Sequence, residues 1–273
     1  MPRWVWTLCF ALLPLPALAQ NPLVPPVPAS DDTATAPPQL LRAAPPSANA
    51  SAEELEAQGD RLRAEKAYAD AIDYYRAALA KSTKHTAVLH NKSGIAQLLM
   101  LHYDQAKKEF ERAIKRDPFY AEAYNNLGVV NYSQRDYKRA IRRYQKALEL
   151  RETSASFHSN LGTAYFVRKQ YDKASAEYLR ALELDPDIFE RQSATGVSAR
   201  LPSPSERARF SYVIAKMYAK SGNADRCLLY LKRAMEAGYA GMSNVYTDEE
   251  FAQVRKDPRF TELMASKPVA VPN

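Results

Sequence analysis

The sequence is poor in cysteine, histidine and glycine. Its 273 residues include two cysteines, four histidines and eight glycines. Cys9 lies in the apolar N-terminal stretch, so loss of that stretch would leave Cys227 with no intramolecular disulfide partner. One thiol cannot form a thiolate zinc site, and the histidines include no H-x-x-x-H pair. We therefore expect no metal site, and we expect Cys227 to be a small buried packing residue.

Motifs that bind nucleotides or position nucleophiles are absent as well. The sequence contains no G-x-x-x-x-G-K-[ST], no G-x-G-x-x-G and no G-x-S-x-G. Acidic residues such as Glu53 and Glu54 lie where a helix is expected to begin, and there they complement the helix dipole. We therefore assign no catalytic residue and no cofactor, and we expect that the chain is not an enzyme.

Long apolar runs are limited to the N-terminus. Arg3 precedes an apolar run from Trp4 to Leu18, and Ala17-Leu18-Ala19 has the small-x-small pattern of a cleavage site. We expect residues 1–19 to be a signal peptide that is cleaved after Ala19, so that the protein is periplasmic or secreted. The alternative is an uncleaved N-terminal membrane anchor, although two prolines interrupt the run. After cleavage we expect no transmembrane segment.

Proline, in contrast, is abundant but concentrated in one region. Many of the 18 prolines lie between residues 22 and 46, in a stretch that is also rich in alanine, serine and threonine. Such a segment cannot bury enough apolar surface to offset its ordering entropy. We expect residues 20–50 to be a disordered linker.

The rest of the chain repeats itself with a period close to 34 residues. A pair of alanines seven residues apart recurs four times, with an aromatic residue between its members and a glycine twelve residues before it. The alanine pairs are Ala71/Ala78, Ala106/Ala113, Ala140/Ala147 and Ala174/Ala181; the glycines are Gly59, Gly94, Gly128 and Gly162; the aromatics are Tyr75, Phe110, Tyr144 and Tyr178. Each unit contains two runs of helical apolar periodicity, which predicts a helix hairpin with the small residues where its helices cross.

This spacing, with its L-G, aromatic and alanine positions, resembles the tetratricopeptide repeat. The resemblance implies an all-α fold, a right-handed α-solenoid of antiparallel helix hairpins behind a disordered N-terminal region. On that alignment the four repeats, within 51–188, are 52–85, 87–120, 121–154 and 155–188.

A degenerate fifth unit follows an interruption. An inserted loop is expected over 189–205, with a short helix at Ile188–Gln192, and residues 206–267 should form a fifth repeat and C-terminal capping helices. Cys227 and Ala234 take the alanine positions there, Leu231 the aromatic one and Ala215 the glycine one. In the tail we expect a capping box formed by Thr247 and Glu250, and a helix that starts at Asp257-Pro258.

The family resemblance also implies a binding surface. Tetratricopeptide arrays hold a peptide or partner protein in the concave groove formed by the first helix of each pair, and Asn126 and Asn160 resemble the asparagines that bond a peptide backbone there. An amide side chain suits that task because it offers both donor and acceptor. The groove positions on this alignment are Asn91, Ile95, Leu98, Asn125, Asn126, Val129, Tyr132, Asn160, Thr163 and Phe166.

The two ends of the predicted array differ in charge. The first repeat offers Glu53, Glu56 and Asp60, and the fifth offers Arg209, Lys216 and Lys220, which would either orient an extended ligand or merely solubilise the ends.

The net charge of +7 includes a basic stripe at Lys138, Arg139, Arg142, Arg143 and Lys146, and a second stripe at Lys107, Lys108, Arg112, Lys115 and Arg116. These stripes would be either a solvated outer face or a contact for an anionic polymer or membrane surface. No nucleic-acid partner is expected.

The sequence therefore predicts a non-catalytic protein–protein interaction scaffold of the cell envelope or exterior. The main alternative is a binding module for an anionic envelope polymer or membrane surface, and a weaker one is an accessory domain of a separate processing enzyme.

Overall fold

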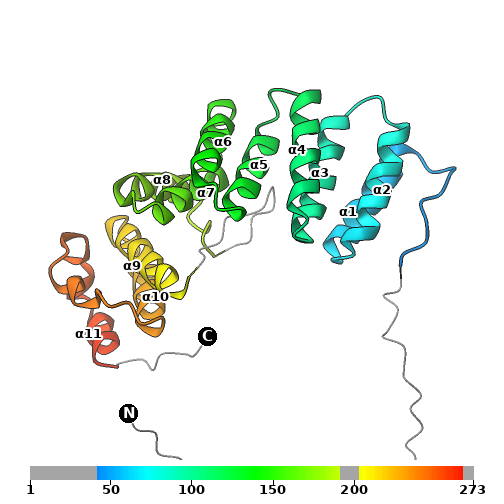
Figure 1. Cartoon of the computed structure of the whole chain (residues 1–273). Coiled ribbons are helices and arrows are strands. Elements are labelled where there is room, and N and C mark those ends of the chain that lie inside the picture. Colours follow the sequence, from blue (N-terminus) through cyan, green and yellow to red (C-terminus); the bar gives the residue numbers. More distant parts are fainter. Residues whose placement is uncertain (1–41, 191–202, 267–273) are drawn as a thin grey trace, which may run out of the picture. The chain divides into compact units, whose positions relative to one another are not determined.

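The computed structural model describes residues 42–190 and 203–266, and all regular secondary structure within them is helical (Figure 1). Five antiparallel hairpins follow one another, each in contact with the next. They are α1 (Ala52–Ala64) with α2 (Tyr68–Lys81), α3 (Thr86–Leu99) with α4 (Tyr103–Arg116), α5 (Ala121–Ser133) with α6 (Tyr137–Leu150), α7 (Ala155–Val167) with α8 (Tyr171–Leu184), and α9 (Pro204–Lys220) with α10 (Ala224–Glu236). The predicted all-α solenoid of helix hairpins is confirmed.

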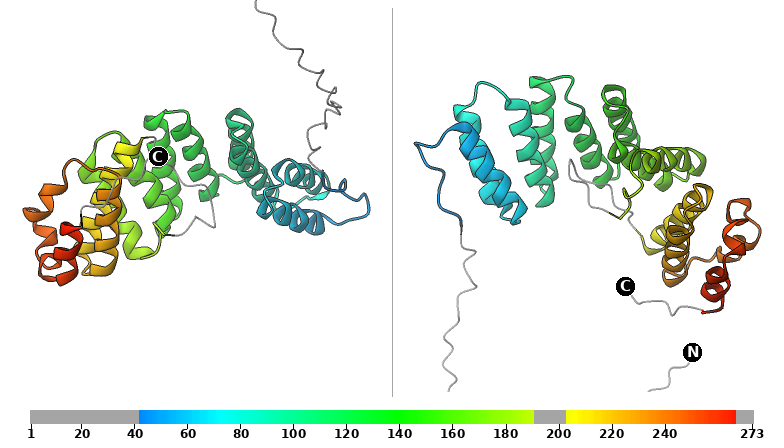
Figure 2. Two further views of the ribbon diagram at one scale, coloured as in Figure 1. Left: turned by 90° about the horizontal axis from the view of Figure 1, so that it is seen from below. Right: turned by 180° about the vertical axis from the view of Figure 1, so that it is seen from behind.

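The two helices of a hairpin have different environments. The second helices α4 and α6 are strongly amphipathic and bury only a narrow stripe that includes Ala106, Phe110 and Ala113 in α4. The first helices α5 and α7 are buried on almost every side, because each contacts its own partner, the second helix of the preceding hairpin and the neighbouring first helices. Figure 2 shows these pairs from below and from behind.

The repeated glycines allow the close contact within each hairpin. A Cβ atom built on Gly128 would lie 2.6 Å from the Tyr144 ring, and the other three repeat glycines meet the ring of their own hairpin at 2.6 or 2.7 Å. Any larger residue would have to displace the ring. The fifth hairpin has Ala215 in place of the glycine and Leu231 in place of the aromatic residue, and both are fully buried. The added methyl group of alanine is thus matched by a side chain smaller than an aromatic ring.

The turns inside the hairpins share one backbone feature. The residue two places after each first helix has positive φ, which satisfies the last helical carbonyls in the manner of a Schellman turn. These residues are Lys66, Leu101, Arg135, Lys169 and Gly222.

The junction between the fourth and fifth hairpins differs from the others. Residues 186–190 form a turn that packs on α9 and α10, where the Phe189 ring meets Phe210 at 5.6 Å. The short helix expected at Ile188–Gln192 is therefore wrong for residues 188–190, and residues 191–192 lie outside the described part. The expected loop over 189–205 also lies mostly outside it, and α9 already begins at Pro204, where Ser203 caps the helix by accepting from the Glu206 N–H.

Short 3-10 helices and one α-helix follow the fifth hairpin. They are η1 (Met242–Tyr246), η2 (Glu249–Phe251), η3 (Val254–Lys256) and α11 (Pro258–Ala265). Phe251, Val254 and Phe260 are buried against α9 and α10, as a cap over apolar helices requires.

One predicted cap is present in this segment and the other is not. Asp257 caps α11 by accepting from the Arg259 N–H, as predicted. The predicted capping box at Thr247 is wrong: the Thr247 hydroxyl donates to the Asn244 carbonyl, and Glu250 pairs with Lys216 instead. A three-residue 3-10 turn offers no α-helical first turn for such a box to close.

The segment before α1 is partly described. Residues 42–50, which we expected to belong to the linker, lie along α2 and are bonded to it. The expected signal peptide and the rest of the linker lie outside the described residues. No helix in the described ranges is long and apolar enough to cross a membrane.

Candidate interaction surface

Four asparagines on consecutive first helices bond to one another. The Asn126 side-chain NH2 group donates to the side-chain oxygen of Asn91 at 2.9 Å. The Asn160 side-chain NH2 group donates to the side-chain oxygen of Asn125, also at 2.9 Å. Asn125 donates to Asn126 at 3.1 Å, which joins the two links into one chain of amides across α3, α5 and α7. We call these four residues the amide ladder. At its N-terminal end Asn91 donates to the Tyr120 hydroxyl at 3.3 Å.

The amide ladder follows a fixed register between repeats. The fifth residue of one repeat pairs with the sixth of the next, which gives Asn91 with Asn126 and Asn125 with Asn160. The same rule joins the first two repeats, where Glu56 accepts from Lys92 at 2.6 Å. At the next joint the sixth position of the fifth repeat, in which Ala215 takes the glycine position, is Val213. Its side chain cannot hydrogen-bond, so the register ends at α7.

All ten predicted groove residues are buried. The four asparagines are 0–3 % exposed, and the other six do not exceed 8 %. Helix position predicted that these residues share one face of the first helices, but it carries no information on how closely neighbouring repeats approach. Ligand binding by these residues stays a prediction, and in the free chain the asparagines hold neighbouring repeats in register.

The other predicted members of the groove pack within the array. Tyr132 meets Tyr137 edge-on at 5.3 Å, and Phe166 meets Phe210 of α9 at 6.1 Å. Thr163 donates its hydroxyl to the Ser159 carbonyl at 2.8 Å. Ile95, Leu98 and Val129 belong to the same apolar core cluster.

Charges at the two ends of the array are paired internally. Lys92 lies 2.6 Å from Glu56 and 2.5 Å from Asp60, while Lys216 lies 3.0 Å from Asp248 and 3.2 Å from Glu250. These pairs neutralise Glu56 and Asp60 at the acidic end, and Lys216 at the basic end, of the charge pattern that the sequence suggested for orienting a ligand.

Two histidine–glutamate pairs were not foreseen from the sequence. The Nδ1 atom of His90 lies 2.7 Å from Glu109, and that of His158 lies 2.6 Å from Glu177; both pairs join the two helices of one hairpin. The available signal was a glutamate nineteen residues after each histidine. Within the described ranges, no group of three or more His, Cys, Asp or Glu side chains is placed to hold a metal ion.

The basic stripe on α6 is solvated. Arg139 pairs with Asp136 at 3.3 Å and Lys146 with Glu149 at 2.9 Å. Arg142 is exposed and Arg143 is half-buried. The structure thus leaves a predominantly positive outer surface on this helix.

Comparison with known proteins gives a family match and fold similarities. A model of the tetratricopeptide repeat matches residues 92–155 and 132–187. Among curated proteins, none matches the sequence significantly.

Solved structures with a similar fold include the protein TTC0263 of Thermus thermophilus, with 19% identity, a TM-score of 0.48, and coverage of 79% of this chain and 100% of that one. MamA 41-end from Desulfovibrio magneticus RS-1 has 18% identity and a TM-score of 0.47, and the match covers 68% of this chain and 94% of that one. YrrB, described as a TPR protein with an unusual peptide-binding site, has 20% identity and a TM-score of 0.45, and the match covers 72% of this chain and 91% of that one.

The matched segment spans the second to fourth hairpins, where the glycine, aromatic and alanine positions recur in register and build the observed contacts. Residues 92–187 of the chain are therefore tetratricopeptide repeats.

Proposed function

We propose that this protein is a non-catalytic scaffold that binds an extended segment of a partner protein along the face of α3, α5 and α7 that carries the amide ladder. The observation behind the proposal is the ladder itself. Asn91, Asn125 and Asn126 each use one amide N–H in the bonds described, and a carboxamide has two. Peptide backbones present alternating carbonyls and N–H groups, which such a row of amides matches in chemistry.

Burial of the ladder sets a condition on binding. With the asparagines 0–3 % exposed, a peptide reaches them only when neighbouring first helices move apart. In a solenoid each repeat contacts only its nearest neighbours, so small changes at each joint between hairpins suffice to separate the first helices.

The test uses the full chain as bait, followed by direct binding between purified proteins. Asn125→Leu and Asn126→Leu together should abolish binding of a captured partner, because leucine keeps the number and branching of the side-chain heavy atoms but removes the amides. Arg142→Glu with Arg143→Glu on the outer face is the matched control and should leave binding intact. Each variant is first shown to be folded by its circular dichroism melt. Unchanged partner binding by the folded double leucine variant contradicts the proposal.

The second candidate function rests on the α6 stripe. A predominantly positive, solvated helix face attracts anionic polymers through interactions that salt screens. Here Arg142→Glu with Arg143→Glu should abolish retention on a soluble polyanion such as dextran sulfate, and retention of the native chain should fall steeply between low and physiological salt. Retention that is insensitive to both excludes this function.

We further propose that the protein acts in the periplasm or outside the cell, on the signal-peptide pattern of residues 1–19. Mass spectrometry of the exported protein should find a mature chain that starts at Gln20. A chain that keeps Met1 would instead indicate an N-terminal anchor.

A further inference from the structure

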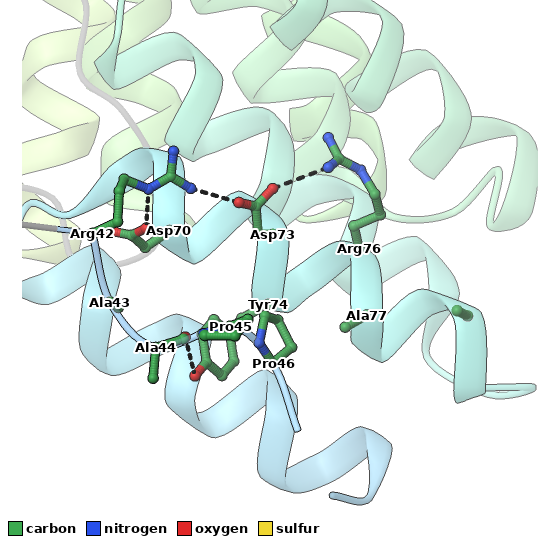
Figure 3. Close-up of a pocket in the computed structure, with 11 residues that line it drawn as sticks. Arg42, Ala43, Ala44, Pro45, Pro46, Asp70, Asp73, Tyr74, Arg76 and Ala77 are labelled. Atoms are coloured by element: carbon green, nitrogen blue, oxygen red, sulfur yellow. Dashed lines mark hydrogen bonds and ion pairs between the residues drawn. The ribbon is translucent and has the colours of Figure 1, made fainter. Parts of the chain in front are cut away.

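The segment that precedes α1 lies on the surface of α2, away from the amide ladder. Residues 42–50, here called the strap, run along the outer side of α2 (Figure 3). The Arg42 guanidinium bonds to Asp70 and lies 2.6 Å from Asp73, and the Tyr74 hydroxyl donates to the Ala44 carbonyl at 3.0 Å. One arginine side chain and one main-chain carbonyl are therefore recognised at the start of the strap.

The far end of the strap is held through its backbone. The Lys81 ammonium group donates to the Ala48 carbonyl at 2.6 Å and to the Ala50 carbonyl. Carbonyls are common to every peptide, so this end recognises backbone, here in a turn where the Ala50 N–H donates to the Ser47 carbonyl at 3.3 Å. The aspartates, in contrast, select a basic residue.

The outer face of α2 differs from the corresponding faces of the other hairpins. Ala77 stands where the others carry Arg112, Lys146 and Arg180, and Ala80 where they carry Lys115, Glu149 and Glu183. Asp70 replaces Gln105, Arg139 and Lys173. On α2 the alanines leave room for the strap backbone, and the buried Asp70 carboxylate supplies negative charge for Arg42. The corresponding helices of the other hairpins lack this combination.

The strap fills its site incompletely. A hollow of about 540 Å³ remains between the strap and α2, lined by Ala44, Pro45 and Pro46 on one side and by Tyr74, Ala77 and Ala80 on the other (Figure 3). The strap presents only alanine side chains at positions 43 and 44. A peptide with larger apolar side chains at these two positions would bury additional surface.

We propose that the outer face of α2 is a second peptide-binding site, for extended segments in which a basic residue precedes a proline pair by three positions, and that the strap is its built-in competitor. The Arg42 side chain is 57% exposed and that of Asp73 40%, and exposed ion pairs contribute little on their own. Tethering keeps the strap bound despite these weak contacts, because a linked segment has an effective concentration on the order of millimolar. A better-fitting peptide in trans displaces it.

The experiment uses the full chain and a fluorescent peptide with the sequence of residues 42–50, and it measures anisotropy. Arg42→Ala in the protein weakens the strap and should raise affinity for the free peptide by about tenfold or more over the native chain, since a tethered competitor has been weakened. A peptide carrying Ala43→Leu and Ala44→Leu should bind several-fold more tightly still, by filling the hollow.

Two sets of variants test the site itself. Adding Asp70→Asn and Asp73→Asn to the Arg42→Ala protein should abolish peptide binding, while Asp172→Asn, in the first turn of α8, should not. Tyr74→Phe removes a single hydroxyl and should weaken binding without disturbing the fold.

Equal peptide binding to the native and Arg42→Ala proteins overturns the proposal, and so does binding that survives loss of both aspartates. Asn125→Leu with Asn126→Leu should leave this binding unchanged, which separates the site from the amide ladder.

Discussion

At the scale of single residues, Tyr144 has an unsatisfied polar group. Its hydroxyl is buried and has no hydrogen-bond partner within the described ranges, and burial raises its pKa well above the ordinary value. The corresponding Tyr178 donates to Thr163 at 3.2 Å, but Val129 occupies the equivalent position beside Tyr144. One hydrophobic substitution therefore separates a satisfied tyrosine from an orphaned one.

Tyr144→Phe should stabilise the protein, because it removes a buried hydroxyl without creating a cavity. We expect a gain of about 1 kcal/mol in the free energy of unfolding, measured by urea denaturation. Tyr178→Phe is the matched control and should lose stability, since it leaves Thr163 without that donor. A loss of stability in Tyr144→Phe would show that its hydroxyl has a partner.

The glycine–ring contact can be tested by exchanging it for the arrangement of the fifth hairpin. Gly128→Ala should cost about 1–3 kcal/mol, because the new methyl group overlaps the Tyr144 ring. Adding Tyr144→Leu recreates the Ala215 and Leu231 pair and should recover part of this loss. Additive effects in the double-mutant cycle would contradict a direct steric contact.

His158 makes stability depend on pH. Burial disfavours its charged form, but hydrogen bonds to Glu177 and to the Glu152 carbonyl, at 2.6 and 2.9 Å, outweigh burial and raise its pKa above the usual value. The folded state therefore binds the proton more tightly than the unfolded state. The resulting stability is complete below about pH 6.5, the pKa of a free histidine, and is lost as pH rises through the raised pKa.

His158→Gln should remove this part of the pH dependence. Urea midpoints measured between pH 5.5 and 8.5 should fall less with rising pH in this variant than in the native protein. His102→Gln, at an exposed site, should behave like the native protein. Equal slopes for His158→Gln and the native chain would refute the assignment.

At the scale of elements, the hairpin turns use unfavourable residues. Leu101 has a φ of 62° and a 67% exposed side chain, in a position that glycine fills in the fifth hairpin as Gly222. Leu101→Gly should stabilise the protein by about 0.5–1 kcal/mol, because glycine carries no left-handed penalty. Gly222→Ala should show the opposite sign. Thermal melts of both variants decide the matter, and destabilisation by Leu101→Gly would mean that its side chain packs productively.

The hairpins were predictable because their signals are local and repeated. Gly128 and Tyr144 recur at fixed spacing, and the structure brings them into contact within one hairpin. The strap was not predictable, since its composition matches the linker before it; its determinants lie in α2, at Asp70 and Asp73. Burial of Asn126 was equally hidden, because it depends on the approach of separate repeats.

At the scale of the whole molecule, the joints between hairpins fall into two kinds. The first three are crossed by side-chain pairs in one register, which the amide ladder exemplifies. The fourth lacks this pairing, and the turn at 186–190 fastens it instead: Arg226 bonds to the Pro186 carbonyl at 2.9 Å and to Asp187, and Arg233 pairs with Glu190 through two bonds of 3.2 Å.

Because a solenoid is stabilised by nearest-neighbour contacts, a joint held by partly exposed arginines should open on its own. Arg226→Ala with Arg233→Ala should therefore speed amide hydrogen exchange in α9 and α10 while leaving α3 and α5 unchanged, since the amide ladder does not reach the fourth joint. Lys232→Ala, on the exposed face of α10, is the control and should alter neither region. Faster exchange throughout the array would instead show that the five hairpins unfold as one unit, and that the two arginines stabilise the whole rather than this joint.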